Sequence, residues 1–442
     1  MAAHAPRRHV RFSKLVVRFT ALNLALAATA IVTSPILART LGPTGRGEVA
    51  AIFAIVGLAP WISEFGLTSY LTRARARNEA PVGVLVGSTL PFTLAGGCAG
   101  AALAVPVAHL LGRGRPVVVA FIELGLFMLP LTAVAQTFYG LMVADERWGL
   151  TALTRAVALG GSALCIVVLA VFHALSVTSV ATSYLGLGVV GSFIYFYALR
   201  GALPLRFSRR IAGEGLSFGL KSWTSTIAGV GNLQLDQVLM AGLVPSRVLG
   251  LYALAVTLTS ATNAMVSAVS TVLMPRVSAG ARELATRASR LTVFVTLVFG
   301  AVVGGTAPVA VPLVFGSRFD GAVPMVAILL VANIFLAEST VLGATLVALG
   351  RPDATVRAQV PSLVLTVPAL ILCLPATGGV GAAAVSLAAY ALTFWISARA
   401  VVAELALSMR DLTLLRREDV AWLRARVKPW LLRMGLKRRR KS

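Results

Sequence analysis

Long apolar segments recur along the chain from Leu22 to Leu405, and short breaks rich in glycine, proline and arginine separate them. Each segment approaches or exceeds the roughly 20 residues that an α-helix needs to cross a bilayer. None shows the alternation of apolar and polar positions that a membrane-spanning strand requires. Because backbone groups in lipid must be hydrogen-bonded internally, helices are the expected elements. The pattern predicts an all-α polytopic membrane protein.

We expect about twelve transmembrane helices in two six-helix lobes. A basic segment at residues 1–14 precedes the first lobe at residues 15–199, and a linker at residues 200–213 leads to the second lobe at residues 214–405. A basic amphipathic tail follows at residues 406–442. The expected helices cover residues 15–38, 48–70, 82–112, 117–143, 150–173, 177–199, 214–243, 247–275, 288–316, 321–349, 356–375 and 380–405.

The distribution of charge agrees with this division. Only 13% of the residues are charged, against about a quarter in soluble domains. Most of the 40 basic residues fall in the termini and in the connections on the same side of the membrane as the termini. This positive-inside bias predicts a plasma-membrane protein with both termini in the cytoplasm, and it favours contact with anionic lipid over nucleic acid. The opposite side is expected to hold only Arg39, Arg46, Arg113, Arg115, Arg247 and Arg318.

Motifs that would indicate an enzyme lack the context they need. The stretch GLSFG at residues 215–219 matches the G-x-S-x-G nucleophile pattern, which requires a strand-to-helix turn, yet it opens an expected membrane helix. Lys221 follows without the glycine spacing of a phosphate loop. The sequence predicts no enzyme, no cofactor and no metal site. No ligand spacing exists among His4, His9, His109, His173, Cys98, Cys165 and Cys373.

An internal repeat relates the two lobes. LGPTGRGEVAAIFAIV from Leu41 aligns with VPSRVLGLYALAVTLT from Val244, so that Gly47 matches Gly250, 203 residues later. Parallel repeats of this kind are typical of transporters that hold substrate between two halves. A helical scaffold with an accidental similarity is the alternative.

Polar residues in the seventh expected helix point to a transport path. Asn232 and Asp236, in the stretch GNLQLDQVLMAGL, are four residues apart and share a helix face. Lipid cannot solvate such a face, so we expect it to line a polar pathway and to bind substrate. A purely structural hydrogen-bond cluster between helices is the alternative.

Four further charged residues are candidates. Arg18 and Lys221 occupy the same repeat position near the cytoplasmic ends of their helices, where two cations could hold a diphosphate. Both side chains could instead extend to the lipid headgroups. Glu64 and Glu338, together with Asp236, are candidates for ion coupling, although each glutamate could equally tie two helices together.

The tail after residue 405 mixes apolar and basic residues. Leu412, Trp422, Leu423 and Trp430 lie among arginines. The pattern is typical of a helix that lies on the cytoplasmic membrane surface and binds anionic lipids. A disordered solubilising tail is the alternative.

Seven blocks, spread roughly over residues 22–405, carry a family resemblance. They are LARTLGPTGRGEVA, EFGLTSYLTRA, NLQLDQVLMAGLVPSRVLGLYALA, STVLMPRVS, PLVFGSRFDGAVPMVAIL, TLVALGRPDA and GGVGAAAVSLAAY. In order and spacing they resemble Wzx-type polysaccharide flippases of the multidrug/oligosaccharidyl-lipid/polysaccharide exporter (MOP) superfamily. The resemblance implies two lobes, alternating access, a cationic cavity, and export of a polyprenyl-diphosphate-linked oligosaccharide. By motif it supports Asp236, with Asn232 beside it, as a functional residue.

The leading hypothesis is therefore a flippase for a lipid-linked oligosaccharide or glycolipid in cell-surface polysaccharide biosynthesis. Its expected partners are that substrate, anionic lipids at the tail, and glycosyltransferases or a polymerase of the same pathway. One alternative is a small-molecule or drug cation antiporter of the same superfamily, whose cavity should be acidic or aromatic. A lipid II flippase and a scaffold that recruits glycosyltransferases are two others.

Overall fold

The computed structural model describes residues 7–112, 114–200, 203–260 and 283–413, together with positions 262, 263, 266, 277, 416, 418 and 419. Within these residues every regular element is helical, which confirms the all-α prediction. The first half contains α1 (Arg7–Ser63), α2 (Leu67–Ala76), α3 (Val82–Ala102), α4 (Ala104–Gly112), α5 (Pro116–Phe127), α6 (Leu129–Ala144), α7 (Trp148–Arg155), the π-helical turn η1 (Ala156–Gly160), α8 (Gly161–Val171) and α9 (Val177–Leu199). The second half contains α10 (Arg209–Leu243), α11 (Ser246–Thr259), α13 (Glu283–Phe315), the 3₁₀ helix η3 (Ser317–Ala322), α14 (Val323–Ala348), α15 (Pro352–Leu405) and α16 (Met409–Thr413).

The helices are long enough for a polytopic membrane protein. Seven of those described can cross a membrane by length and composition, or eight when the bent pair α5–α6 counts as one span. Two helices are each interrupted by a left-handed glycine, Gly42 in α1 and Gly378 in α15. The 54 residues of α15 would extend for ~80 Å as one straight helix, more than twice the ~30 Å hydrocarbon core. The breaks at these glycines match the boundaries that the sequence predicts between two pairs of spans.

One expected boundary differs from the structure, and one expected helix lies partly outside the described residues. α10 begins at Arg209, so the linker expected at residues 200–213 is shorter than predicted. The eighth expected helix, residues 247–275, is described as α11 and at a few later positions, and the rest of it lies outside the described residues.

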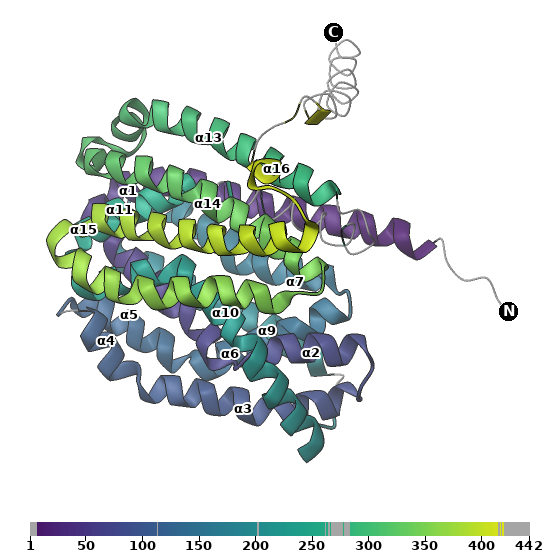
Figure 1. Ribbon diagram of the computed structural model, residues 1–442. Coiled ribbons are helices and arrows are strands. Elements are labelled where there is room, and N and C mark those ends of the chain that lie inside the picture. The colour runs from purple at the N-terminus through teal and green to yellow at the C-terminus, as the bar shows by residue number, and fades with distance from the viewer. Residues whose placement is uncertain are drawn as a thin grey trace, which may run out of the picture.

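The helices run side by side in one bundle (Figure 1). In that view α13, α14 and α15 form the upper part, α2 to α6 form the lower part, and α10 contacts both. In its first half, α10 donates a hydrogen bond from Ser222 to the Gly66 carbonyl, whereas in its second half Asn232 donates to the Gln359 carbonyl of α15. We call the end of the bundle where α1 begins the terminal end and the opposite end the far end.

At the far end, α1 and α11 cross at very close range. A Cβ on Gly47 would lie 1.8 Å from the Ser246 carbonyl oxygen, and a Cβ on Gly250 would lie 1.8 Å from the Pro43 carbonyl oxygen. Pro43 and Ser246 are also 203 residues apart, like the two glycines. Such reciprocal contact is what a twofold relation between the two lobes produces. The aligned glycines of the repeat are therefore partners in one crossing, which we call the far-end seam.

The start of the basic tail folds back onto α13. The Arg290 guanidinium donates to both carboxylate oxygens of Asp419, at 2.6 and 2.9 Å, and to the Asp411 carbonyl at 2.8 Å. These hydrogen bonds hold the pKa of Asp419 at about 2, below its ordinary value. The tail is thus anchored as far as this buried carboxylate, while the lipid-binding helix expected beyond it lies outside the described residues.

Candidate functional site

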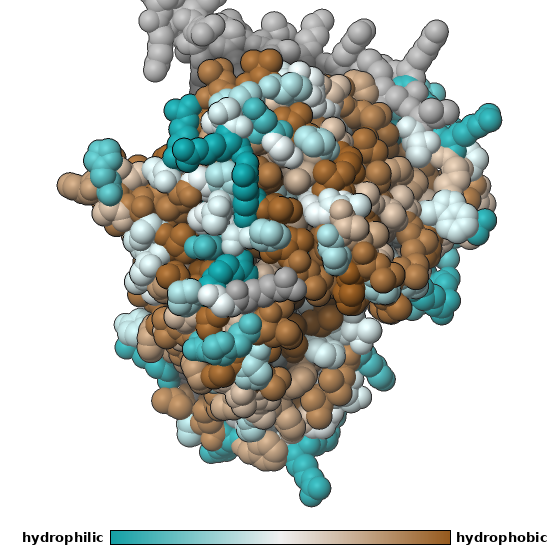
Figure 2. Space-filling view, turned by 90° about the vertical axis from the view of Figure 1, so that its left-hand side faces the viewer, coloured by the Kyte–Doolittle hydropathy of each residue, from teal (hydrophilic) through white to brown (hydrophobic). Residues whose placement is uncertain are grey.

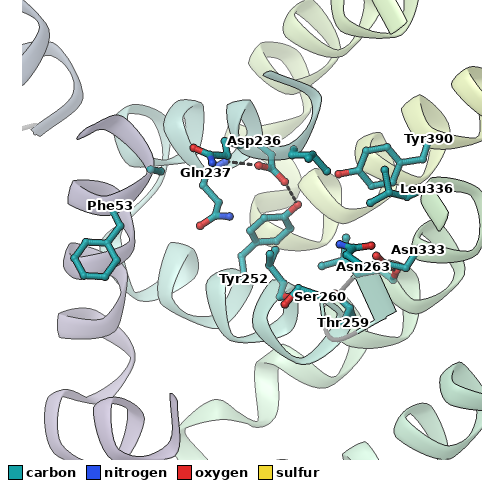
Figure 3. Close-up of a pocket in the computed structure, with 15 residues that line it drawn as sticks. Phe53, Asp236, Gln237, Tyr252, Thr259, Ser260, Asn263, Asn333, Leu336 and Tyr390 are labelled. Atoms are coloured by element: carbon teal, nitrogen blue, oxygen red, sulfur yellow. Dashed lines mark hydrogen bonds between the residues drawn. The ribbon is translucent and has the colours of Figure 1, made fainter. Parts of the chain in front are cut away.

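A cavity of about 330 Å³ lies among α1, α10, α11, α14 and α15 (Figure 3). Its walls combine aromatic rings, amides and hydroxyls with one carboxylate, that of Asp236. Most of the lining comes from the C-terminal half, and α1 contributes one wall from the N-terminal half. The lining residues are Phe53, Ala54, Leu233, Gln234, Asp236, Gln237, Tyr252, Val256, Thr259, Ser260, Asn263, Leu329, Asn333, Leu336 and Tyr390.

Asp236 is held by hydroxyl and amide donors. Only 5% of its surface is exposed. The Tyr252 hydroxyl of α11 donates to Asp236 Oδ2, and the backbone N–H of Gln237 lies 2.7 Å from Oδ1. Tyr252 lies 3.2 Å from the Ser386 hydroxyl of α15, which extends the network to a third helix. Figure 3 shows the carboxylate directed at the tyrosine hydroxyl across the cavity wall.

Asn232 lies one turn before Asp236 and joins the same helices. Its Nδ2 donates to the Gln359 carbonyl at 3.3 Å, and the Tyr390 hydroxyl donates to the Asn232 backbone carbonyl at 3.1 Å. Within the described part of the chain, the side-chain oxygens of Asn232, Gln234 and Asn333 are buried and have no hydrogen-bond donor. Unsatisfied buried acceptors are costly, and a proton donor or a cation would satisfy them.

The electrostatic character of the cavity differs from the expectation raised by the family resemblance. That resemblance implies a cationic cavity for an anionic donor, but Asp236 is the one charged residue of this lining. No arginine or lysine of the described residues forms an ion pair with it. A buried carboxylate surrounded by hydroxyls and amide oxygens suits a proton or a small cation. Across the described residues, no cluster of three or more His, Cys, Asp or Glu could hold a metal ion.

The structure does not bring the other predicted substrate residues to this cavity. Lys221 is exposed and lies fifteen residues before Asp236 on α10, which corresponds to ~22 Å along the helix. Arg18 belongs to α1, but its side chain lies outside the described residues. The expected pairing of these two cations therefore stays a prediction.

The two glutamates predicted for ion coupling are both buried and hydrogen-bonded. Glu64 lies in the break between α1 and α2 and accepts from the Thr68 hydroxyl. Glu338 of α14 accepts from the Ser289 hydroxyl of α13, which also contacts the Leu412 carbonyl at 2.9 Å. Glu338 thus ties α14 to α13, in line with one of the two sequence interpretations. Neither glutamate lines the cavity.

Sequence reasoning misses three residues. Tyr252 and Tyr390 lie in apolar helices, where the hydroxyl of the tyrosine itself is the one sign that it could bind a polar group. The expectation that Arg46 lies in an outer loop is wrong, because it lies within α1 and only 7% of its surface is exposed. The break is confined to Gly42, and the helix resumes at Pro43, a residue suited to the first turn of a helix.

Comparisons with known proteins agree with this architecture. Residues 16–280 match the family model described as "polysaccharide biosynthesis protein". A search of curated proteins finds no match. Among solved structures, the lipid II flippase MurJ in its inward closed conformation superposes with a TM-score of 0.71 at 11% identity, covering 90% of this chain and 89% of that chain.

Multidrug transporters share the fold as well. An inward-facing multidrug resistance MATE family transporter of the MOP superfamily superposes with a TM-score of 0.67 at 15% identity, over 88% of this chain and 99% of that chain. The MATE multidrug transporter DinF-BH gives a TM-score of 0.62 at 14% identity, over 91% of this chain and 97% of that chain. At these identities the likeness shows a common fold.

Proposed function

We propose a transport reaction on the premise that this chain belongs to the polysaccharide biosynthesis protein family. The protein flips a polyprenyl-diphosphate-linked oligosaccharide or glycolipid from the cytoplasmic to the outer face of the plasma membrane. The terminal end of the bundle faces the cytoplasm, as the positive-inside distribution of basic residues favours. The far end then faces outward.

The family match carries the proposal, because it covers residues 16–280 and names polysaccharide biosynthesis. The fold supports it independently, since a lipid II flippase superposes over 90% of the chain. A diphosphate-sugar headgroup cannot enter hydrocarbon unaided, whereas a polyprenyl tail can remain in lipid. Rocking of the two lobes, which opens and closes the far-end seam, would expose the headgroup to each side in turn.

Asp236 is the coupling residue in this scheme. A proton or a small monovalent cation binds its carboxylate, with Tyr252 and the neighbouring amide oxygens as further contacts. Because five helices from both halves line the cavity, a change in its occupancy would alter how they pack against each other. Asn232 links α10 to α15 at the same level. Lys221 and Arg18 would act separately, receiving the diphosphate near the cytoplasmic entrance.

The test is transport by the purified protein in liposomes. A fluorescent polyprenyl-diphosphate oligosaccharide in the inner leaflet should reach the outer leaflet faster than in protein-free liposomes. An imposed proton or sodium gradient should accelerate it in wild type but not in Asp236→Asn. Asp320→Asn is the matched control, since Asp320 is an exposed carboxylate in η3. Wild-type liposomes that move no glycolipid, with several glycans tried, would overturn the proposal.

A second candidate is an antiporter for small organic cations. One observation favours it: the cavity is acidic and aromatic, as expected for a cationic ligand. The same liposomes should then accumulate a lipophilic cationic dye in exchange for protons that leave down an imposed gradient. Dye transport without glycolipid movement would favour this candidate, and the reverse result would favour the flippase.

A scaffold function is the non-transporting alternative. In that case removal of residues 412–442 should abolish polysaccharide assembly in cells, whereas Asp236→Asn should have no effect. The flippase proposal expects the opposite order of severity. Association with glycosyltransferases or a polymerase, and binding of the tail to anionic lipid, stay predictions.

A further inference from the structure

A buried guanidinium lies just beneath the far-end seam. Arg46 belongs to α1, one turn beyond the break at Gly42. Its Nη1 donates to the Ser34 carbonyl at 3.3 Å, and its Nη2 donates to the Thr257 hydroxyl at 3.0 Å. Ser34 precedes the break in α1, and Thr257 lies on α11 in the opposite lobe. The side chain therefore bridges three helical segments and both lobes.

The charge of Arg46 is not neutralised by the protein residues around it. No described carboxylate forms an ion pair with the guanidinium, whose two hydrogen-bond acceptors are a carbonyl and a hydroxyl. Arg46 Nε and the adjacent Ser34 hydroxyl are buried and have no hydrogen-bond partner in the described part of the chain. A buried cation with neutral partners and spare donors is costly, and such groups in membrane proteins mark ligand or ion pathways.

The internal repeat shows that Arg46 has no basic counterpart in the second lobe. Its counterpart in the second lobe, 203 residues later, is Leu249, which is fully buried. The glycine crossing above is reciprocal, but this cation occurs on one side only. A residue needed simply to pack the seam would be served by the leucine found in the other half. The asymmetry indicates a role in recognition rather than in packing.

We propose that Arg46, with Ser34, recognises the phosphate groups of the transported lipid in the outer half of the path; this rests on the proposed flippase function. The guanidinium fork matches phosphate geometry, and Nε and the Ser34 hydroxyl supply two further donors. Phosphate oxygens are stronger acceptors than a threonine hydroxyl. Phosphate binding at Nη2 therefore replaces the contact with Thr257 and releases one bond between the lobes.

Two other arginines at this end differ from Arg46. Arg39 donates to the Leu313 and Val314 carbonyls at 2.6 and 2.8 Å, and Arg115 donates to the Ser246 hydroxyl at 2.7 Å. Both hold the N-terminal lobe against the C-terminal lobe. Figure 2 faces this end of the bundle and shows hydrophilic side chains gathered among apolar ones. Arg39 is exposed and Arg115 is half-buried, so of these three Arg46 is the one that is buried.

A thiol reporter beneath the seam tests the proposal. Ala253 is buried and lies one turn below Gly250 on the same face of α11. Ala253→Cys is introduced after Cys98, Cys165 and Cys373 are replaced, and its labelling by a membrane-impermeant maleimide is timed in phosphatidylcholine nanodiscs. Farnesyl diphosphate at saturation should accelerate labelling several-fold, because it opens the seam. Farnesol, which has no phosphate, should have no effect.

Matched variants separate recognition from folding. Arg46→Gln should abolish the response to farnesyl diphosphate, while Arg247→Gln, which removes an exposed arginine of α11, should keep it. Thr257→Val should raise basal labelling and leave little further response, since no bond to Arg46 remains for the phosphate to release. Arg46→Lys, which keeps the charge without the fork, should respond weakly and serves where Arg46→Gln does not fold. A full response in Arg46→Gln, or in Arg46→Lys where only that variant folds, overturns the proposal.

A comparison of farnesyl diphosphate with phosphatidic acid identifies the source of the phosphate. A response to farnesyl diphosphate but not to phosphatidic acid assigns the site to the prenyl diphosphate. A response to both assigns it to any membrane-lipid phosphate. If the wild-type protein flips no glycolipid yet shows the Arg46-dependent response, the anion site stands and the flippase proposal falls. If the protein flips glycolipid but its response does not depend on Arg46, the flippase proposal stands and the anion site falls.

Discussion

Substitution of the seam glycines should open the far end of the protein. In Gly47→Ala the new Cβ would lie 1.8 Å from the Ser246 carbonyl oxygen, whereas real Cβ contacts essentially never fall below 3.0 Å. α1 and α11 must therefore separate locally by roughly 1.2 Å or more, the difference between these distances. The obstructing atom belongs to the backbone, so a change of side-chain rotamer cannot relieve the clash. The closed arrangement is destabilised relative to any state in which the helices stand apart.

The size of the effect follows from the usual cost of overpacking. Extra methyl groups in a tight interior cost about 1–3 kcal/mol. If the open state escapes this cost, the ratio of open to closed molecules rises by about fivefold to about 150-fold. Gly250→Ala should behave alike, because its Cβ would meet the Pro43 carbonyl at the same distance. The double variant should show less than the sum of the two effects, since one separation relieves both clashes.

The assay is the labelling rate of Ala253→Cys from the far end, with protein quality checked by size-exclusion chromatography. Gly305→Ala is the matched control, because a Cβ at this helical glycine would meet nothing within 4 Å. Labelling of Gly47→Ala should rise well above that of Gly305→Ala in equally monodisperse samples. Equal rates in the two variants, at wild-type thermal stability, would refute the close crossing and the seam built on it.

Three further outcomes follow from the described contacts. Asp236→Asn should leave the protein folded but remove acceleration of transport by an imposed cation gradient; acceleration equal to that of Asp320→Asn would remove Asp236 from the coupling role. Tyr252→Phe deletes the hydroxyl that donates to Asp236, so the free energy of unfolding should fall by about 1–3 kcal/mol. The pH at which the gradient accelerates transport should also shift, and an unchanged pH profile would contradict the hydrogen bond. In the tail, Arg290 lowers the pKa of Asp419 to about 2, so the ion pair stabilises docking in full above the ordinary pKa of 3.8 and is lost as pH falls through about 2. Hydrogen exchange at residues 409–413, corrected for intrinsic rates, should therefore show protection at pH 5 that Asp419→Asn lacks. Equal protection in both proteins would show that Asp419 does not anchor the tail.

Much of the fold could be predicted because bilayer physics leaves few choices. The apolar segments define the spans, and the position of Gly42 between two of them marks a real break. The polar face of α10 also leads correctly to a buried carboxylate, because Asn232 and Asp236 could not face lipid. These inferences need only local periodicity and solvation.

The partners of Asp236 could not be predicted in the same way. Tyr252 and Ser386 reach it from other helices, and only helix packing decides which hydroxyls meet a given carboxylate. Arg46 is misplaced by sequence reasoning because glycine and proline around it are typical of a loop, whereas one left-handed glycine is enough to turn the chain. A buried arginine with neutral partners carries no local sequence signature that distinguishes it from an exposed one.

The central claim is transport of a lipid-linked glycan, and the most direct test compares two lipids in the same proteoliposomes. A fluorescent polyprenyl-diphosphate oligosaccharide and a fluorescent phosphatidylcholine are placed in the inner leaflet, and their arrival outside is followed by an impermeant quencher. The account predicts rapid movement of the glycolipid, little movement of phosphatidylcholine, and loss of the gradient-driven part in Asp236→Asn. Equal rates for the two lipids, or no movement of the glycolipid by well-folded protein, would contradict it.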